Sequence, residues 1–235
     1  MLGNILGSLI AMNFKSLLKT MSRESKERSL RDFERTVKEL WEDGKIKRPV
    51  HLSGGNEGEL VSLFELIKPE DYVFSTHRNH YHYLLKGGDD LKLIEEMLGR
   101  ETGICGGKSG SMCTTDRKIN FFSTGIIGGG CGIAVGVAWA LRERGSKANV
   151  FCFIGDSVVE TGHFYSAWVY ACCEKLPIVF VIEDNERATC TPSVARTGMD
   201  YPSSFASYGA ITHKIMYYRY KPKYPHVGSG TYVAF

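Results

Sequence analysis

The sequence predicts an α/β fold: a doubly wound, mostly parallel sheet flanked by helices, preceded by an N-terminal helical arm. Two short apolar runs, 150–154 and 178–182, are rich in β-branched and aromatic residues, as are strands buried on both faces. The segment between them is long enough for a crossover helix, so together they form one βαβ unit. Polar residues follow each run directly, at Asp156 and Asn185. Because ligands bind at the carboxyl ends of parallel strands, these side chains are candidate ligands of Mg²⁺ and a diphosphate.

Composition is that of an ordinary globular protein. The 235 residues are 43% hydrophobic and 23% charged with a formal net charge of +3, so the chain can bury a full core. Lys and Arg form no runs interleaved with aromatic residues, and nucleic-acid binding is not expected. The apolar N-terminus is too short to span a bilayer, so no membrane association is expected. Seven scattered cysteines without zinc-site spacing favour reduced thiols in a cytoplasmic protein.

The first 45 residues are expected to form the helical arm, and residues 46–235 the main domain. Apolar residues at three- and four-residue spacing predict an amphipathic helix over 17–45, ending at Gly44. These residues are Leu30, Phe33, Val37, Leu40 and Trp41. In the main domain we expect a helix, a strand and a second helix at 57–67, 72–75 and 91–98.

Two glycine-rich segments follow these elements. Residues 101–116 are predicted to be irregular, either as a surface loop or as a loop that lines a site. A second turn, 123–130, leads into a helix of small residues that includes Gly132 and Gly136, which let a neighbour approach closely. After the βαβ unit a turn-rich segment precedes a last strand, predicted at 212–220.

Several candidate site residues have simpler readings. Asp156 follows a strand, where it can serve only as a helix N-cap, and Asn185 suits a turn. Arg78 can pair with a surface carboxylate, and the neighbouring histidines at 77, 80 and 82 can lie at a solvated strand end. Their density also suits a metal, but no cysteine or carboxylate stands at a familiar zinc spacing, so structural or phosphate contacts are favoured.

Six motifs stand in a fixed order along the chain: HLSGGNE from 51, THRNHYH from 76, GGKSGSM from 106, TGIIGG from 124, GDS and DN at 155 and 184, and YYRYKPKYPH from 217. Over about 33–192, and more weakly over 216–228, the chain resembles the alpha subunit of the thiamine diphosphate-dependent first component of 2-oxo acid dehydrogenase complexes, the pyruvate and acetoin type. The resemblance implies a thiamine diphosphate-binding fold for 46–235. Because few residues separate Asn185 from Arg219, this domain is expected to be C-terminally shortened.

The resemblance also implies roles for residues. Asp156, the side chain of Asn185 and the main-chain carbonyl of Arg187 are expected to bind Mg²⁺. His51 and His226 are expected to be catalytic, since imidazoles titrate near neutral pH. His226 is aligned with the histidine of the family pattern Tyr-Arg-x-x-Gly-His, at a different spacing. The residues expected to bind the cofactor are His77, Arg78, Gly125, Ile127, Gly155, Asp156, Ser157, Val158 and Asn185.

Four positions depart from the family's motifs. Ser157 stands where the family has a glycine beside the diphosphate, and Asp184 stands where it has the first of two asparagines. Cys113 replaces a histidine of the glycine-rich loop. Tyr81 replaces the glycine of His-Gly-His, which is expected to narrow a pocket and, with the shortened domain, to favour a reaction other than standard pyruvate oxidation.

The expected function is that of a subunit of a thiamine diphosphate- and Mg²⁺-dependent enzyme. It decarboxylates a 2-oxo acid and transfers the acyl or aldehyde unit, and it is active only with a beta subunit, in an α₂β₂ assembly, because the glutamate that activates the cofactor comes from that subunit. A lipoyl acyltransferase is a possible further partner. The alternative is a catalytically inactive scaffold or regulatory homologue. An enzyme of another diphosphate cofactor is disfavoured, because no dinucleotide or phosphate-loop motif is present.

Overall fold

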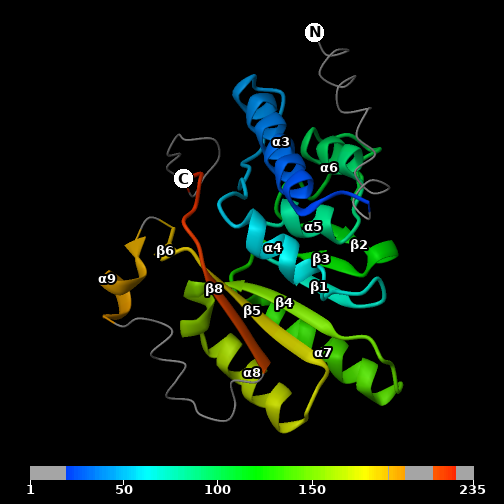
Figure 1. Ribbon diagram of the computed structural model, residues 1–235, viewed down its shortest axis with the longest axis vertical. Helices are drawn as coiled ribbons and strands as arrows, with labels where there is room; N and C mark the ends of the chain where they lie inside the picture. Colours follow the sequence, from blue (N-terminus) through cyan, green and yellow to red (C-terminus); the bar gives the residue numbers. More distant parts are fainter. Residues whose placement is uncertain (1–19, 190, 199–213, 226–235) are drawn as a thin grey trace.

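The computed structural model describes residues 20–189, 191–198 and 214–225, with helices and strands arranged as in Figure 1. The helices of at least five residues are α3 (Arg23–Glu42), α4 (Glu57–Phe64), α5 (His80–Leu85), α6 (Asp90–Met97), α7 (Gly129–Glu143), α8 (Gly162–Cys173) and α9 (Ser193–Thr197), joined by the 3₁₀ segments η1 (Arg117–Ile119) and η2 (Asp156–Glu160). The strands are β1 (Tyr72–Ser75), β2 (Thr115–Asp116), β3 (Phe121–Ser123), β4 (Val150–Gly155), β5 (Ile178–Asp184), β6 (Arg187–Ala188), β7 (Thr191–Pro192) and β8 (Ile215–Arg219). In these parts of the chain, no helix has the length and apolar character needed to cross a membrane.

The sheet confirms the predicted fold class. Six strands lie in the order β2-β3-β1-β4-β5-β8, and all neighbours are parallel except β2 and β3. The chain passes from β1 to β3 on one side of β1, and then crosses to β4 on its other side. This reversal of direction creates a topological switch point. β4 and β5 pair in register from Val150 opposite Ile178 to Gly155 opposite Glu183. The residues that follow the two strands therefore emerge at the same edge of the sheet.

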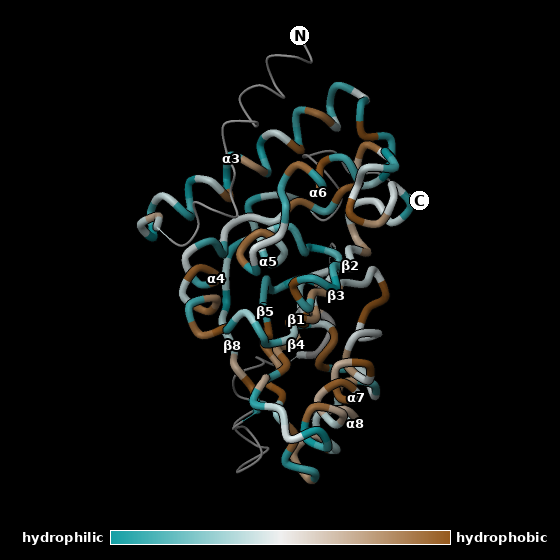
Figure 2. The backbone as a smooth tube through the Cα atoms, turned by 90° about the vertical axis from the view of Figure 1, so that its right-hand side faces the viewer, coloured by the Kyte–Doolittle hydropathy of each residue, from teal (hydrophilic) through white to brown (hydrophobic). Residues whose placement is uncertain are grey.

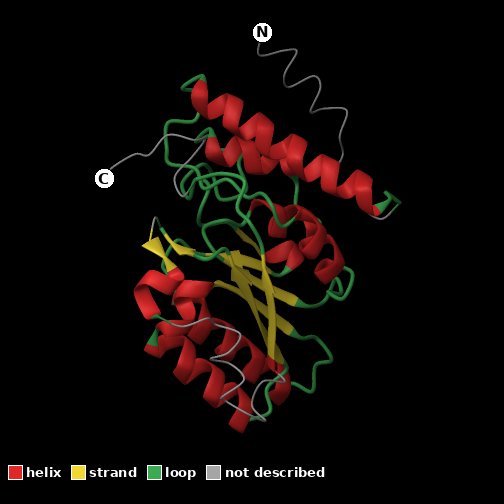
Figure 3. Cartoon of the chain, turned by 60° about the vertical axis from the view of Figure 1, so that its left-hand side comes forward, coloured by secondary structure: helices red, strands yellow, loops and turns green. Residues whose placement is uncertain are grey.

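Helices cover both faces of the sheet (Figure 3). Helices α3 to α6 form one layer, with a core that includes Phe153 and Val181 of the sheet. Helices α7 and α8 lie side by side on the other face, over a core that includes Ile154 and Phe180. Since neighbouring residues of β4 and β5 enter opposite cores, both strands are apolar almost throughout. Apolar segments accordingly run through the middle of the molecule in Figure 2.

The predicted N-terminal helix is confirmed as α3. Ser22 caps it by accepting a hydrogen bond from the Ser25 amide at 3.3 Å. The helix buries Leu30, Phe33 and Val37 in the core that α4 and α5 share. The described part of the predicted arm thus packs against α4 and α5 as part of one helical layer. The division of the chain at residue 45 stays a prediction.

The histidine-rich segment differs from its predictions. Residues 80–85 form a short helix, α5, in which His80 is 0% exposed and His82 is 1% exposed, so neither lies at a solvated strand end. The prediction that Tyr81 narrows a pocket is wrong. Its ring lies in the core beneath α3 and α4, and its hydroxyl donates to Glu57 Oε1 at 3.1 Å. The sequence pattern also did not predict β3, which is too short for an alternation to be recognised.

Candidate functional site

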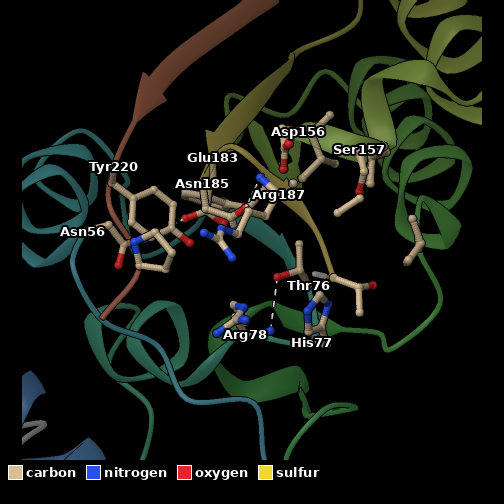
Figure 4. A pocket seen from close by; sticks show the side chains of 18 of the residues that line it. Asn56, Thr76, His77, Arg78, Asp156, Ser157, Glu183, Asn185, Arg187 and Tyr220 are labelled. Atoms are coloured by element: carbon tan, nitrogen blue, oxygen red, sulfur yellow. Dashed lines mark hydrogen bonds between the residues drawn. The ribbon is translucent and has the colours of Figure 1, made fainter. Parts of the chain in front are cut away.

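A cavity of about 930 Å³ opens at the carboxyl ends of β1, β4, β5 and β8 (Figure 4). The turn before α7 completes its wall. Figure 4 shows Asp156 and Ser157 on one side of the cavity and His77 and Arg78 on the opposite side. Parallel strands end together at this edge, which is the usual location of ligand sites in such sheets.

Asp156 begins the 3₁₀ segment that follows β4. Its side chain is buried, since the residue is 1% exposed, and its Oδ2 accepts a hydrogen bond from the hydroxyl of Ser193 in α9. An ionised carboxylate is costly to bury unless hydrogen bonds or a cation compensate it. Asp156 therefore offers a strong oxygen ligand at the wall of the cavity.

Asn185 turns the chain directly after β5. Its Oδ1 accepts a hydrogen bond from the Arg187 amide at 3.0 Å, which is the local turn that the Asp-Asn sequence favours. Glu186 between them has a φ of 60°, in the left-handed region. This turn brings Asn185 and Arg187 to the same cavity as Asp156. An amide oxygen has a second lone pair, so Oδ1 of Asn185 can still bind a cation.

These oxygens suit a hard divalent cation. One carboxylate, one side-chain amide and one main-chain carbonyl are the ligand types that Mg²⁺ prefers. In the described parts of the chain no group of three or more His, Cys, Asp or Glu side chains is arranged to hold a metal ion. The oxygens that this edge offers to a metal are those of the mixed set predicted from the sequence, Asp156, Asn185 and Arg187.

Arg78 is held at the opposite wall by the segment before α4. Its Nη1 donates to the Leu52 carbonyl at 2.6 Å, and its amide donates to Thr76 Oγ1 at 3.2 Å. The hydroxyl of Ser53 donates to the Arg78 carbonyl at 3.4 Å. A guanidinium fixed in this way can pair with phosphate oxygens in the cavity.

The two histidines of this wall contact each other. The rings of His51 and His77 meet edge to face, with centroids 4.8 Å apart. His77 lines the cavity, whereas His51 is 6% exposed and lies behind it. The catalytic role predicted for His51 therefore requires His77, whose ring lies between His51 and the cavity. The other predicted catalytic residue, His226, lies outside the described residues.

Sequence reasoning missed Glu183, which also lines the cavity. Its Oε1 accepts hydrogen bonds from the Tyr218 hydroxyl and from Asn56 Nδ2 at 3.2 Å, and it lies 3.2 Å from His82 Nε2. Burial, followed by the charge of Glu183, raises the pKa of the Tyr218 hydroxyl well above its ordinary value. One signal in the sequence could have identified Glu183: it is a charged residue near the end of an otherwise apolar strand. A carboxylate buried there needs polar partners, which indicates a polar site.

Tyr220, a second missed residue, follows β8 into the cavity. Burial, and next the negative charge of Glu183, raise the pKa of the Tyr220 hydroxyl to about 12, although Arg78 acts in the opposite direction. The side chain of Asn185 also acts to lower the pKa of this hydroxyl. Tyr220 is thus a neutral hydrogen-bonding group between the metal-side and arginine-side walls.

Asp184 takes a structural position. It is 0% exposed, and its Oδ2 accepts hydrogen bonds from the Tyr217 hydroxyl and from Arg219 Nε, the latter at 2.8 Å. Its Oδ1 accepts the Glu186 amide at 2.8 Å. Asp184 therefore fastens β8 and the Asn185 turn to the end of β5 without lining the cavity.

The glycine-rich loop is held by a buried carboxylate, and none of residues 101–116 lines the cavity. Glu96 of α6 accepts hydrogen bonds from the amides of Cys105, Gly107 and Ser109 at 2.7, 2.8 and 2.7 Å. Burial alone raises the pKa of this carboxyl, but these donors outweigh burial, so its pKa lies below the ordinary value. Nearby, His80 lies 2.9 Å from Glu34 Oε1 and 2.8 Å from Ser111 Oγ, which ties the loop to α3.

The structure brings most of the predicted cofactor residues together. Those that line the cavity are His77, Arg78, Ile127, Gly155, Asp156, Ser157, Val158 and Asn185, and Arg187, predicted as a metal ligand, lines it too. Gly125 is not in the lining; a Cβ there would lie 3.7 Å from Met112 and 3.8 Å from Cys113 Sγ. Cys113, which replaces the loop histidine, is exposed and also lies outside the lining.

A model of the dehydrogenase E1 component family matches residues 25–212. The chain belongs to this family. The resemblance predicted from the six motifs is therefore confirmed. Most of the cavity lining lies within the matched segment, whereas its residues 219–225 lie beyond it.

Curated relatives in the E1 family include alpha subunits of two kinds. The chain is 36% identical over 164 residues to the alpha subunit of acetoin:2,6-dichlorophenolindophenol oxidoreductase of Bacillus subtilis, which covers 69% of this chain and 49% of that protein. The corresponding subunit of Cupriavidus necator is 34% identical over 197 residues, covering 83% and 59%. The pyruvate dehydrogenase E1 component subunit alpha of Rickettsia prowazekii is 36% identical over 169 residues, covering 72% and 52%. The chain thus spans about half the length of these E1 proteins.

Proposed function

We propose that this chain is an alpha-type subunit of a thiamine diphosphate- and Mg²⁺-dependent enzyme that acts on a 2-oxo acid together with a beta subunit. The observation that carries the proposal is the convergence of Asp156, Asn185, Arg187 and Arg78 on one cavity. Membership of the E1 family, with relatives named as pyruvate and acetoin enzymes, supports the same conclusion.

In this proposal Asp156, Asn185 and the Arg187 carbonyl hold Mg²⁺, and Arg78 binds the diphosphate from the opposite wall. Ser157 lines the cavity next to Asp156, and its hydroxyl can donate a hydrogen bond to a phosphate oxygen. The replacement of glycine by Ser157 is thus compatible with a diphosphate. Ile127 and the main-chain groups near Gly125, in the turn before α7, orient the pyrimidine ring.

When bound, thiamine diphosphate supplies the nucleophile and the electron sink for cleavage of the 2-oxo acid. The protein orients the reactants, excludes water and moves protons. His77 lines the cavity and His51 contacts its ring, so this pair can hold a proton at the wall. Tyr220, with its raised pKa, stays protonated near neutral pH and donates a hydrogen bond.

The surface of α7 supports a protein partner. Gly132 and Gly136 are exposed within the helix, and a Cβ at either position would meet no atom within 4 Å. Each glycine costs a helix about 1 kcal/mol relative to alanine, so packing in this chain does not account for them. Trp139 on α7 and Tyr165 on α8 are large apolar residues that are also exposed. This face fits a closely packed beta subunit, in an α₂β₂ assembly.

Substrate and acceptor belong to the proposal as well. The acyl or aldehyde unit can be transferred to a lipoyl domain of an acyltransferase or to an aldehyde acceptor. An assay that offers both acceptors to the pair of this chain and its beta subunit distinguishes the two. We expect transfer without the lipoyl carrier, as the departures from the family pattern favour, and exclusive transfer to the lipoyl domain contradicts that expectation.

The test is cofactor binding by this chain co-purified with the family beta subunit expected to be encoded beside it. Thiamine diphosphate with Mg²⁺ is expected to raise the melting temperature of the pair, since a ligand at 100 times its Kd stabilises by about 2.7 kcal/mol. Asp156→Ala is expected to abolish the Mg²⁺-dependent part of the shift. Glu160→Ala, an exposed acid in the same 3₁₀ segment, is the control and keeps it.

Two outcomes decide between the proposal and its alternatives. A melting temperature that thiamine diphosphate and Mg²⁺ leave unchanged, in the lone chain and in the pair, overturns the proposal. Turnover of a 2-oxo acid by the pair that disappears in Asp156→Ala excludes an inactive scaffold.

A further inference from the structure

Counted without a gap from β8, the family pattern Tyr-Arg-x-x-Gly-His ends on a lysine that lines the cavity. β8 pairs with β5 so that Tyr218 lies opposite Glu183 and Arg219 opposite Asp184. Counting the pattern Tyr-Arg-x-x-Gly-His from Tyr218 without a gap, its glycine falls on Pro222 and its histidine on Lys223. Lys223 lines the cavity. The structure thus offers Lys223, at the spacing of the pattern, where sequence comparison had selected His226 at a different spacing.

The backbone of this segment is held against the cavity wall. The Lys223 amide donates to the Gly54 carbonyl at 3.1 Å. A Cβ on Gly55 would lie 2.1 Å from the Lys221 carbonyl oxygen, and the φ of Gly55 is +99°, so both space and backbone conformation require glycine there. Lys221 and Lys223 are therefore fixed beside the wall that carries Arg78.

The acidic groups of the cavity already have partners. Glu183 accepts hydrogen bonds from Asn56 and Tyr218, and Asp156 accepts one from Ser193. Glu186 lies 3.5 Å from Arg219 Nη1. These acids therefore do not form ion pairs with the remaining cationic side chains of the lining.

Three of those cations form no ion pair with any described acidic group. They are Arg187, Lys221 and Lys223, and each lines the cavity. Lys223 Nζ lies 5.9 Å from the centroid of the Tyr224 ring, a contact that leaves its three donors available to an anion. Together they add positive charge beyond Arg78, which the diphosphate engages in the proposed function.

A lysine changes the chemistry of this position. An imidazole exchanges protons near neutral pH, whereas an ammonium is a point cation that donates hydrogen bonds and accepts none. We propose that Lys223, supported by Lys221 and Arg187, selects a substrate with a second anionic group, a carboxylate or a phosphate, beyond its 2-oxo acid moiety. This assignment rests on the proposed function and names the substrate class of the same cavity.

The test compares binding of non-reacting acids to the pair loaded with thiamine diphosphate and Mg²⁺. Isothermal titration calorimetry with butanoate, glutarate and 3-phosphonopropanoate measures the effect of a second carboxylate or a phosphonate. Glutarate or 3-phosphonopropanoate is expected to bind at least tenfold more tightly than butanoate, and the better of the two identifies the second group. In Lys223→Gln this preference is expected to fall to within about threefold, and Lys223→Arg is expected to retain most of it.

Lys108→Gln, an exposed lysine outside the cavity lining, is the matched control and keeps the wild-type preference. With 2-oxobutanoate, 2-oxoglutarate and 3-phosphonopyruvate as substrates, Lys223→Gln is expected to raise KM for the two acids with a second charge at least tenfold more than KM for 2-oxobutanoate. Equal affinity of the wild type for all three probes, or a preference unchanged in Lys223→Gln, overturns the inference. The melting shift with thiamine diphosphate is measured on the same samples, so failure of this inference is separable from failure of the proposed function.

Discussion

At the scale of single residues, a buried carboxylate fixes the glycine-rich loop. Glu96 gathers four donors in addition to the Cys105 amide: the amides of Gly107, Ser109 and Gly110 and the Ser109 hydroxyl. Hydrogen bonds to a charged group contribute about 1.5–3 kcal/mol each. A single side chain thereby fixes a glycine-rich loop whose own residues have little preference for one conformation.

The lowered pKa of Glu96 predicts a pH-dependent contribution to stability. A carboxyl whose pKa is depressed in the folded state stabilises the protein above its unfolded pKa, near 4.5, and loses that effect as the pH falls through the folded value. Glu96→Gln is therefore expected to lower the free energy of unfolding by about 3 kcal/mol at pH 7, because an amide nitrogen then faces the loop donors.

Urea unfolding of both proteins between pH 7 and pH 3.5 measures this effect. The difference between wild type and Glu96→Gln is expected to shrink toward the acid end of the range. Glu95→Gln, at the neighbouring and more exposed position of the same helix, is expected to change stability by less than about 0.5 kcal/mol. A difference for Glu96→Gln that is constant with pH contradicts the assignment.

At the scale of elements, β8 is fastened by polar groups at its carboxyl end. The side chain of Asp184 bonds Tyr217 and Arg219 of β8 and the amide of Glu186 in the site turn. The same carboxylate thus holds an edge strand and positions the turn of Asn185. A carboxylate at position 184 is thus compatible with the ligand role proposed for Asn185.

Removal of this carboxylate is expected to loosen β8. Asp184→Ala removes the acceptor of the Tyr217 hydroxyl, of Arg219 Nε and of the Glu186 amide, and is expected to cost about 3 kcal/mol of unfolding free energy. Amide hydrogen exchange is expected to accelerate over Ile215–Arg219 more than over β4. Tyr217→Phe removes one hydrogen bond of the same group and is expected to cost about 1 kcal/mol. Equal losses in the two variants would show that the ion pair contributes nothing further.

At the scale of the whole molecule, the two helical layers have different surfaces. The layer of α3 to α6 carries charged pairs such as Lys38 with Glu42 at 2.7 Å. The layer of α7 and α8 exposes Ile133, Trp139, Tyr165 and Tyr170. An exposed apolar patch rimmed by polar residues is typical of a protein interface.

Substitutions of Gly136 are expected to have different effects on the stability of the isolated chain and on its pairing with the beta subunit. Gly136→Ala is expected to stabilise the isolated chain by about 1 kcal/mol through helix propensity, whereas Gly136→Leu is expected to abolish co-purification with the beta subunit by blocking close approach. Thermal unfolding and size-exclusion chromatography measure the two effects. Arg28→Leu, on the exposed side of α3, is the control and retains pairing. Retained pairing in Gly136→Leu places the beta subunit elsewhere.

Much of the fold and of the site could be predicted because both depend on local patterns. β4 and β5 were readable from continuous apolar runs, and Asp156 and Asn185 from their places directly after those runs. Tyr81 and the histidines were misplaced because α5 has only six residues, too few for a periodic signal. Glu183 and Tyr220 were missed because their partners are distant in sequence.

The sequence by itself determined the two apolar strands of the βαβ unit, the oxygen-bearing side chains of Asp156 and Asn185 that follow them, and the resemblance to the E1 family. These follow from short-range chemistry: apolar runs, turn residues and motifs at fixed spacing. Only the tertiary structure decided which carboxylates are structural, which histidine reaches the cavity, and that Lys223 lines it. Burial and strand register set these properties, and both arise when segments more than a hundred residues apart, such as Asn56 and Glu183, pack together.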